Sequence, residues 1–176
     1  MKHHLLTCLS IILLACHPAQ AELTPSEQVT FDSILKSSKA PASLTLYEGL
    51  PHQYHEPEIR QREIDTKRVV VIHGESFYEK PIKVGDDDIE PLRQISSLSS
   101  GYKSIQGFKM CGGFHADYCL KWISGTSISY VLICFGCGEI KFCDEKQTLI
   151  SDLKQDTGNR FGDILRKYRE QRPPRK

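Results

Sequence analysis

Hydrophobic and polar positions alternate along several short stretches of the chain, mostly in its second half. Alternation with a period of two residues predicts β-strands that bury one face. Turn-forming residues at 124–127 and 144–146 separate neighbouring stretches, so we expect two antiparallel hairpins in this half. The predicted strands are residues 43–47, 118–123, 128–135, 139–143 and 147–153.

A second strand signal comes from four consecutive branched apolar residues, Val69 to Ile72. Such a run predicts a buried strand within residues 68–73. Residues 77–84 are its expected hairpin partner. Pro81 has no backbone N–H to donate, so it confines that partner to a sheet edge or a bulge.

Helical signals occur at four places along the chain. Thr24, Pro25 and Glu27 form a capping box with proline at the first helical position, which predicts a helix ending near residue 37. Three acidic residues at 86–88 would stabilise the start of another helix through its dipole. The apolar positions expected to face the core are Phe31, Ile34 and Leu35 in the first helix, Ile89, Leu92, Ile95 and Leu98 in the third, and Phe161, Ile164, Leu165 and Tyr168 in the last. The other predicted helices are a polar one at 57–65 and a final one at 157–171.

These elements together predict an α+β fold, with an antiparallel sheet of about five or six strands covered by two or three helices. A chain of 176 residues is expected to form one domain. Residues 22–42 are interpreted as an N-terminal helix and linker, residues 43–172 as a single α+β domain, and residues 173–176 as a basic tail.

The first 21 residues have the pattern of a signal peptide. Lys2 precedes an apolar run at 5–15, Pro18 breaks that run, and Ala19 and Ala21 are small residues at the recognition positions before a cleavage site. The run is too short for a permanent membrane span. The sequence therefore predicts export to the periplasm or the medium. In the alternative, residues 13–16 act as a lipobox and Cys16 carries a lipid anchor.

The composition and net charge of the chain limit the classes of molecule that it is expected to bind. The net charge of +1 and the hydrophobic content of 39% are typical of a soluble globular protein, and they argue against nucleic-acid binding. Basic residues gather in the last predicted helix. Peripheral association with the cell envelope is therefore expected to use either this basic helix or a lipid on Cys16, although a solvated helix face explains the basic residues as well.

The cysteines form the clearest chemical cluster, because five of the seven lie between residues 111 and 143. Export favours structural disulfides for such a cluster. The five are an odd number, so at least one thiol must stay free, pair outside the chain or bind a metal. Cys111 is expected near Cys134 or Cys137, since the hairpin between them folds the chain back, while Cys119 and Cys143 are secondary candidates.

Zinc binding is the second interpretation of this cluster. Cys134 and Cys137 have the C-x-x-C spacing of a zinc knuckle, followed by a glycine that tolerates the turn. Cys111 and His115 would complete a tetrahedral site. No other cofactor is indicated. Residues 48–56 contain His52, His55 and two glutamates around a turn, which is a weaker candidate site than a solvated loop.

Catalysis is the third interpretation. Cys111 would be the nucleophile, His115 the base and Asp117 the orienting residue, with Gly112 and Gly113 presenting backbone N–H groups. Alternatively, Cys134 and Cys137 would form a redox dithiol, but strand alternation rather than a helix follows this motif. A tight turn explains the two glycines more simply. We therefore expect no catalysis, with a thiol enzyme or thiol–disulfide redox protein as the alternative.

Three segments resemble a family of exported bacterial proteins of unknown function. They are residues 46–52 (Leu-Tyr-Glu-Gly-Leu-Pro-His), 111–118 (Cys-Gly-Gly-Phe-His-Ala-Asp-Tyr) and 134–139 (Cys-Phe-Gly-Cys-Gly-Glu). The resemblance covers residues 43–172 and implies export but no activity, ligand or fold. The function expected from the sequence is a small exported, envelope-associated domain with a binding or structural role and a structural Cys/His cluster.

Overall fold

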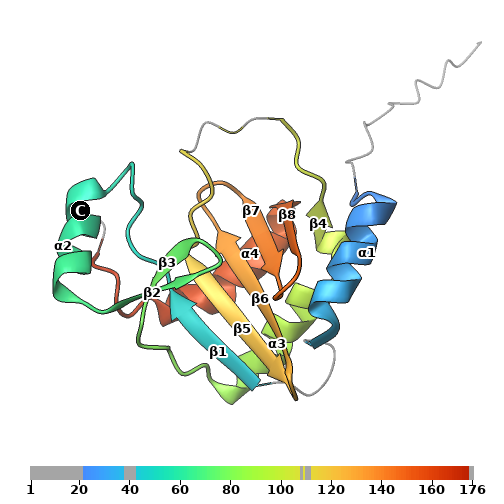
Figure 1. Ribbon diagram of the computed structural model, residues 1–176, viewed down its shortest axis with the longest axis horizontal. Helices are drawn as coiled ribbons and strands as arrows, with labels where there is room; N and C mark the ends of the chain where they lie inside the picture. Colours follow the sequence, from blue (N-terminus) through green and yellow to red (C-terminus); the bar gives the residue numbers. More distant parts are fainter. Residues whose placement is uncertain (1–21, 38–42, 108, 110–111, 175–176) are drawn as a thin grey trace, which may run out of the picture.

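The protein has an α+β fold, seen here in a computed structural model that describes residues 22–37, 43–107, 109 and 112–174. Within these residues the chain forms a six-stranded antiparallel sheet, a separate two-stranded sheet and four α-helices (Figure 1). The predicted fold class is therefore confirmed. No helix in the described ranges combines the length and apolarity needed to cross a membrane. The predicted signal peptide and Cys16 lie outside the described residues.

The large sheet has the strand order β1-β5-β6-β7-β8-β4, and all neighbours are antiparallel. The expected hairpins β5–β6 and β7–β8 are present, and Gly125 supplies the positive φ that the tight turn between β5 and β6 requires. Strand β4 was not predicted, because it is only two residues long. The strands are β1 Ser43–Glu48, β4 Tyr102–Lys103, β5 Tyr118–Ser124, β6 Ser127–Cys134, β7 Glu139–Cys143 and β8 Thr148–Leu153.

Three helices cover one face of this sheet and form the main core with it. They are α1 (Pro25–Ile34), α3 (Asp86–Ser97) and α4 (Gln155–Leu165). The capping box at Thr24 is confirmed, and Phe31 points inward to pack its ring against Phe142 at 5.0 Å between centroids. Burying a side chain of this size contributes roughly 1.5–3 kcal/mol, so this face holds most of the apolar stabilisation.

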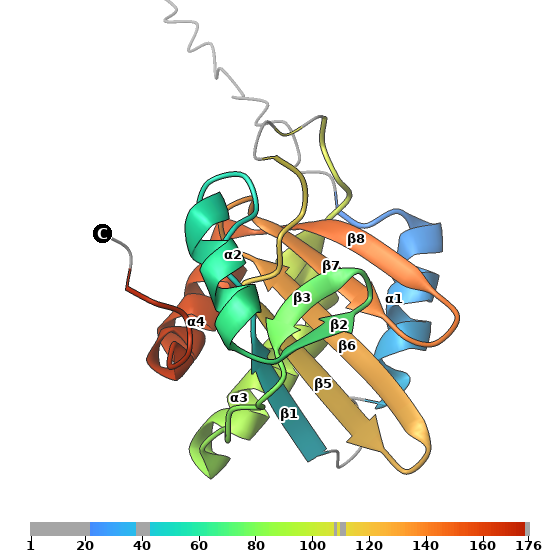
Figure 2. The same cartoon turned by 60° about the vertical axis from the view of Figure 1, so that its left-hand side comes forward.

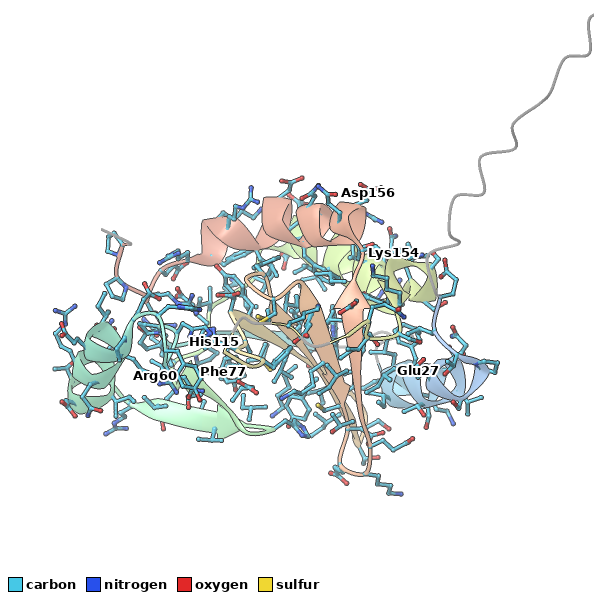
Figure 3. The ribbon with its side chains drawn as sticks, turned by 90° about the horizontal axis from the view of Figure 1, so that it is seen from above. Glu27, Arg60, Phe77, His115, Lys154 and Asp156 are labelled. Carbon is cyan, nitrogen blue, oxygen red and sulfur yellow. The ribbon has the colours of Figure 1, made fainter. Side chains whose placement is uncertain are left out.

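The opposite face of the sheet is covered by a hairpin of β2 (Val69–Ile72) and β3 (Glu75–Tyr78). Figure 3 shows this hairpin and α4 on opposite sides of the sheet. The prediction of a buried strand at 69–72 is wrong, because the hairpin lies at the periphery and Val71 is 66% exposed. Its predicted partner at 77–84 is also displaced. Strand β3 ends at Tyr78, ahead of Pro81, and a turn at His73 and Gly74 with positive φ at both residues sets this register.

The last helix differs from its predicted range of 157–171. Helix α4 begins at Gln155, ends at Leu165 and continues only as a short 3-10 turn over Arg166–Tyr168. The chain then leaves the helix because the backbone N–H groups of residues 170–172 donate to the carboxylate of Glu48. The remaining helix, α2 (Pro57–Thr66), lies at one end of the molecule beside this C-terminal segment (Figure 1).

Candidate functional site

Four segments that are far apart in the sequence meet at one end of the large sheet. They are residues 48–56 after β1, residues 112–117 before β5, residues 134–138 between β6 and β7, and residues 170–172. Figure 2 shows α2 and the β2–β3 hairpin side by side near this end, and Figure 3 places His115 among them. The three segments that carry the family resemblance thus contribute to one site.

Gly49 explains why the first two segments lie so close together. Its backbone N–H donates to the carbonyl of Asp117 at 2.8 Å. A Cβ atom at this position would lie 1.9 Å from the carbonyl oxygen of Ala116, which is far inside van der Waals contact. Only glycine therefore permits this approach of the two backbones.

Glu48 holds the C-terminal segment against the end of β1. The carboxylate is almost fully buried and accepts hydrogen bonds from the backbone N–H groups of Glu170 (3.0 Å), Gln171 (2.7 Å) and Arg172 (3.1 Å). Three donors on one carboxylate satisfy a charge that would otherwise be costly to bury. The main chain of residues 170–172 is thereby fixed at the site.

Arg172 extends this network to the 112–117 segment. Its guanidinium donates to the carbonyl of Gly49 from Nε (3.0 Å) and Nη2 (2.8 Å), and to Asp117 Oδ1 from Nη1 (2.8 Å). Asp117 Oδ2 accepts the backbone N–H of Phe135 at 2.8 Å. The two side chains are only 4% and 13% exposed, so this is a buried ion pair with its hydrogen bonds made.

His115 is buried beside this ion pair, and its Nε2 lies 2.8 Å from the carbonyl oxygen of Leu50. Since a carbonyl only accepts, Nε2 carries the proton and donates. Burial lowers the pKa of His115 below 6.5, although the negative charge of Asp117 acts in the opposite direction. The imidazole is therefore neutral at pH 7 and ties the 112–117 segment to the loop after β1.

Two further histidines adjoin His115 and line a cavity of about 490 Å³. The ring centroid of His52 lies 4.6 Å from that of His115 and 4.3 Å from that of His55. His52 Nδ1 accepts the backbone N–H groups of Tyr54 and His55, which fixes its ring. We call this space the histidine cavity; it is defined by His52, His55, Glu56, His115, Asp117 and Cys134.

Cys134 places a buried thiol in the wall of the histidine cavity. Its Sγ accepts backbone N–H groups from Cys137, at 3.2 Å, and from His115. Burial nevertheless raises the pKa of the thiol, so it is protonated at neutral pH. The thiol thus serves as a hydrogen-bond acceptor between two of the converging segments.

The other described cysteines divide into two groups. Cys119 and Cys143 carry free thiols beneath the β2–β3 hairpin, away from the cavity, and burial raises the pKa of both. Cys137 lines the cavity, with its Sγ 3.3 Å from the carbonyl oxygen of Gly113. The predicted site residue Cys111 lies outside the described residues.

The predicted zinc site finds no support in the described geometry. No group of three or more His, Cys, Asp or Glu side chains within the described ranges is arranged to hold a metal ion. Cys111, one of the four predicted ligands, lies outside the described residues, so zinc binding by Cys111, His115, Cys134 and Cys137 stays a prediction.

The nucleophile of the predicted catalytic arrangement, Cys111, lies outside the described residues, and only His115 and Asp117 of that arrangement are described. His115 and Asp117 are close together, as expected, but both carboxylate oxygens of Asp117 are used, by Arg172 and by the N–H of Phe135. The Nε2 atom of His115 is directed to a backbone carbonyl. Sequence reasoning missed Arg172 altogether, because a basic residue near the end of the chain has no local signal for burial.

A second cavity, of about 710 Å³, runs along α4 on the other side of Arg172. We call it the arginine groove and define it by Tyr118, Phe135, Leu153, Lys154, Arg166 and Arg169. It shares three lining residues with the histidine cavity: Asp117, Gly136 and Arg172. The Arg172–Asp117 ion pair is thus a common wall of the two cavities.

Comparisons with protein-family models, with curated proteins and with solved structures give no match. The resemblance of residues 46–52, 111–118 and 134–139 to an exported bacterial family stays a prediction. What these segments do together is therefore derived from the site itself.

Proposed function

We propose that this protein is a small exported, envelope-associated binding domain whose Cys/His cluster is structural rather than catalytic. The observation that supports this proposal is the engagement of the cluster's polar atoms. His115 donates to Leu50, Asp117 accepts from Arg172 and Phe135, and Cys134 accepts backbone N–H groups. Groups used in this way hold the converging segments in place.

We further propose that a disulfide between Cys111 and Cys137 adds a covalent connection to the same junction. Cys111 directly precedes Gly112 and Gly113, and the carbonyl oxygen of Gly113 lies 3.3 Å from Cys137 Sγ. Export would supply the oxidising compartment in which such a bond persists. Breaking a native disulfide in a small exported domain typically costs about 2–5 kcal/mol of stability.

A thiol enzyme is the second candidate, because Cys134, His115 and Asp117 line one cavity. A nucleophilic cysteine must form a thiolate readily, through a lowered pKa or an adjacent base. Burial raises the pKa of Cys134 instead, and the hydrogen bonds of its neighbours are directed elsewhere. The binding domain is therefore the better supported function.

Thiol chemistry on the exported protein distinguishes the two candidates. With Ellman's reagent at pH 7, we expect Cys134 in the folded protein to react more slowly than glutathione, using Cys134→Ser to identify its contribution. After unfolding without reductant, we expect three reactive thiols, those of Cys119, Cys134 and Cys143. Peptide mapping should join Cys111 to Cys137, and intact mass should show cleavage after Ala21.

Two results would contradict this proposal. Reaction of Cys134 faster than glutathione in the folded protein would favour the thiol enzyme. Five reactive thiols after unfolding without reductant would show that the protein contains no disulfide, and this would contradict the proposed structural bond. A mass that fits an acylated Cys16 would be compatible with the binding function. It would show that the domain is attached to the membrane through a lipid on Cys16.

A further inference from the structure

The arginine groove carries more positive than negative charge among its lining residues. Its cations are Lys154, Arg166, Arg169 and Arg172, and its carboxylates are Glu48 and Asp117. Both carboxylates are already engaged, Glu48 with three backbone N–H groups and Asp117 with Arg172 and Phe135. Lys154 pairs with Glu22 at 2.7 Å. The two lining cations without a buried or close carboxylate partner among the described residues are Arg166 and Arg169.

These two arginines keep most of their hydrogen-bonding capacity. Arg166 lies 3.9 Å from Asp163, and both side chains are about three-quarters exposed, so this pair is weak in water. The guanidinium of Arg169 donates one hydrogen bond, to the carbonyl of Pro173 at 3.0 Å. A guanidinium has five N–H donors in a planar fork that suits carboxylate, sulfonate or phosphate oxygens.

Part of the groove lining is apolar. The rings of Tyr118 and Phe135 meet edge to face, with 6.2 Å between their centroids, and Leu153 lies in the same wall. Gly136 and Gly158 line the groove without filling it. A volume of about 710 Å³ falls within the range of roughly 300–1,000 Å³ that is usual for small-molecule sites.

We propose that the arginine groove binds an amphipathic organic anion. Its anionic group lies against Arg166 and Arg169, and its aromatic or aliphatic body covers Tyr118, Phe135 and Leu153. An inorganic anion would leave the apolar wall uncovered, and a nucleic acid is disfavoured by the net charge of only +1. This inference rests on the proposed binding function and assigns it a ligand class.

The test uses two fluorescent probes that differ in charge. 8-Anilinonaphthalene-1-sulfonate carries an anionic group on an aromatic body, and N-phenyl-1-naphthylamine is its neutral counterpart. We expect the sulfonate to bind the folded protein with one-to-one stoichiometry and at least tenfold more tightly than the neutral probe. Inorganic sulfate should displace it only at concentrations at least a hundredfold above the Kd of the probe.

Variants locate the binding site. The double variant Arg166→Gln/Arg169→Gln should weaken binding of the sulfonate at least tenfold, because two charge-assisted contacts are lost. The matched control Arg62→Gln/Arg160→Gln removes the same charge from exposed positions that do not line the groove, and it should change the Kd less than twofold. Unfolding curves of both variants confirm that they are folded before titration.

Equal loss of binding in the two double variants would overturn the groove proposal, because it would mean a non-specific charge effect. Equal affinity for the charged and the neutral probe would overturn it as well, since the arginines would then play no part. Failure of the sulfonate to bind, with the thiol results as expected, would reject the ligand class alone and leave the structural role of the Cys/His cluster standing.

Discussion

The histidine cavity and the arginine groove share a wall, the Arg172–Asp117 ion pair, but differ in how their polar groups are used. In the cavity, the residues with the most suggestive chemistry, Cys134, His115 and Asp117, form hydrogen bonds that hold the backbone. In the groove, Arg166 and Arg169 have few such bonds. The comparison shows that engaged polar groups stabilise the fold, whereas unengaged ones remain available for a ligand.

The largest expected effect is a difference in protein stability between substitutions of two arginines that lie three residues apart in the sequence. Arg172→Met should lower the free energy of unfolding by about 3 kcal/mol, because it leaves Asp117 and the carbonyl of Gly49 without their buried partner. Arg169→Met removes an exposed side chain and should change it by no more than about 0.5 kcal/mol. Urea unfolding followed by circular dichroism measures both values.

Similar losses of stability in these two variants would contradict the conclusion that Arg172 has a structural role and Arg169 does not. A stable Arg172→Met protein would mean that Arg172 is as dispensable for folding as the groove arginines. In that case the network of Glu48, Arg172 and Asp117 would no longer support a structural interpretation of the site.

Much of the fold was predictable because local patterns determine it. Alternation located β5 to β8 to within one or two residues, and the capping box located the start of α1. The run Val69 to Ile72 correctly indicated a strand, but its burial was predicted wrongly, since branched apolar residues indicate a strand and not how deeply it is buried. The end of α4 was also missed, because it depends on Glu48, more than a hundred residues away in the sequence.

The candidate site was only partly predictable. Spacing identified His115, Cys134 and Cys137 as a candidate cluster with Cys111, and Asp117 as the orienting residue of the catalytic alternative. The four of these that the structure describes line one cavity. The role of each residue depends on partners that no local pattern reveals: the carbonyl of Leu50 for His115, and Arg172 for Asp117. The arginine groove was missed because Arg166 and Arg169 look like a solvated helix face, and only the fold brings Tyr118 and Phe135 into the same groove.

A smaller effect tests the attachment of the C-terminal segment. Glu48→Gln removes the charge that accepts three backbone N–H groups, and it should cost about 1.5–3 kcal/mol, the usual contribution of hydrogen bonds to a charged group. The matched control is Glu170→Gln, which makes the same change at an exposed residue. Limited trypsin digestion should cut after Arg169 faster in Glu48→Gln than in wild type. Equal cleavage rates would show that Glu48 does not hold this segment.

The smallest effect concerns the pH dependence of stability. Burial lowers the pKa of His115 below 6.5, so as the pH falls through 6.5 the unfolded chain binds a proton at this residue more readily than the folded one. Stability is therefore complete above about pH 6.5 and falls as the pH is lowered below this value. His115→Gln keeps a donor for Leu50 and should flatten this decline, while the exposed control His55→Gln should not. Asp88, whose pKa the hydrogen bond with Lys167 lowers below 3.8, titrates at a lower pH. Parallel curves for wild type and His115→Gln, measured by urea unfolding at each pH, would show that His115 is not held neutral by the fold.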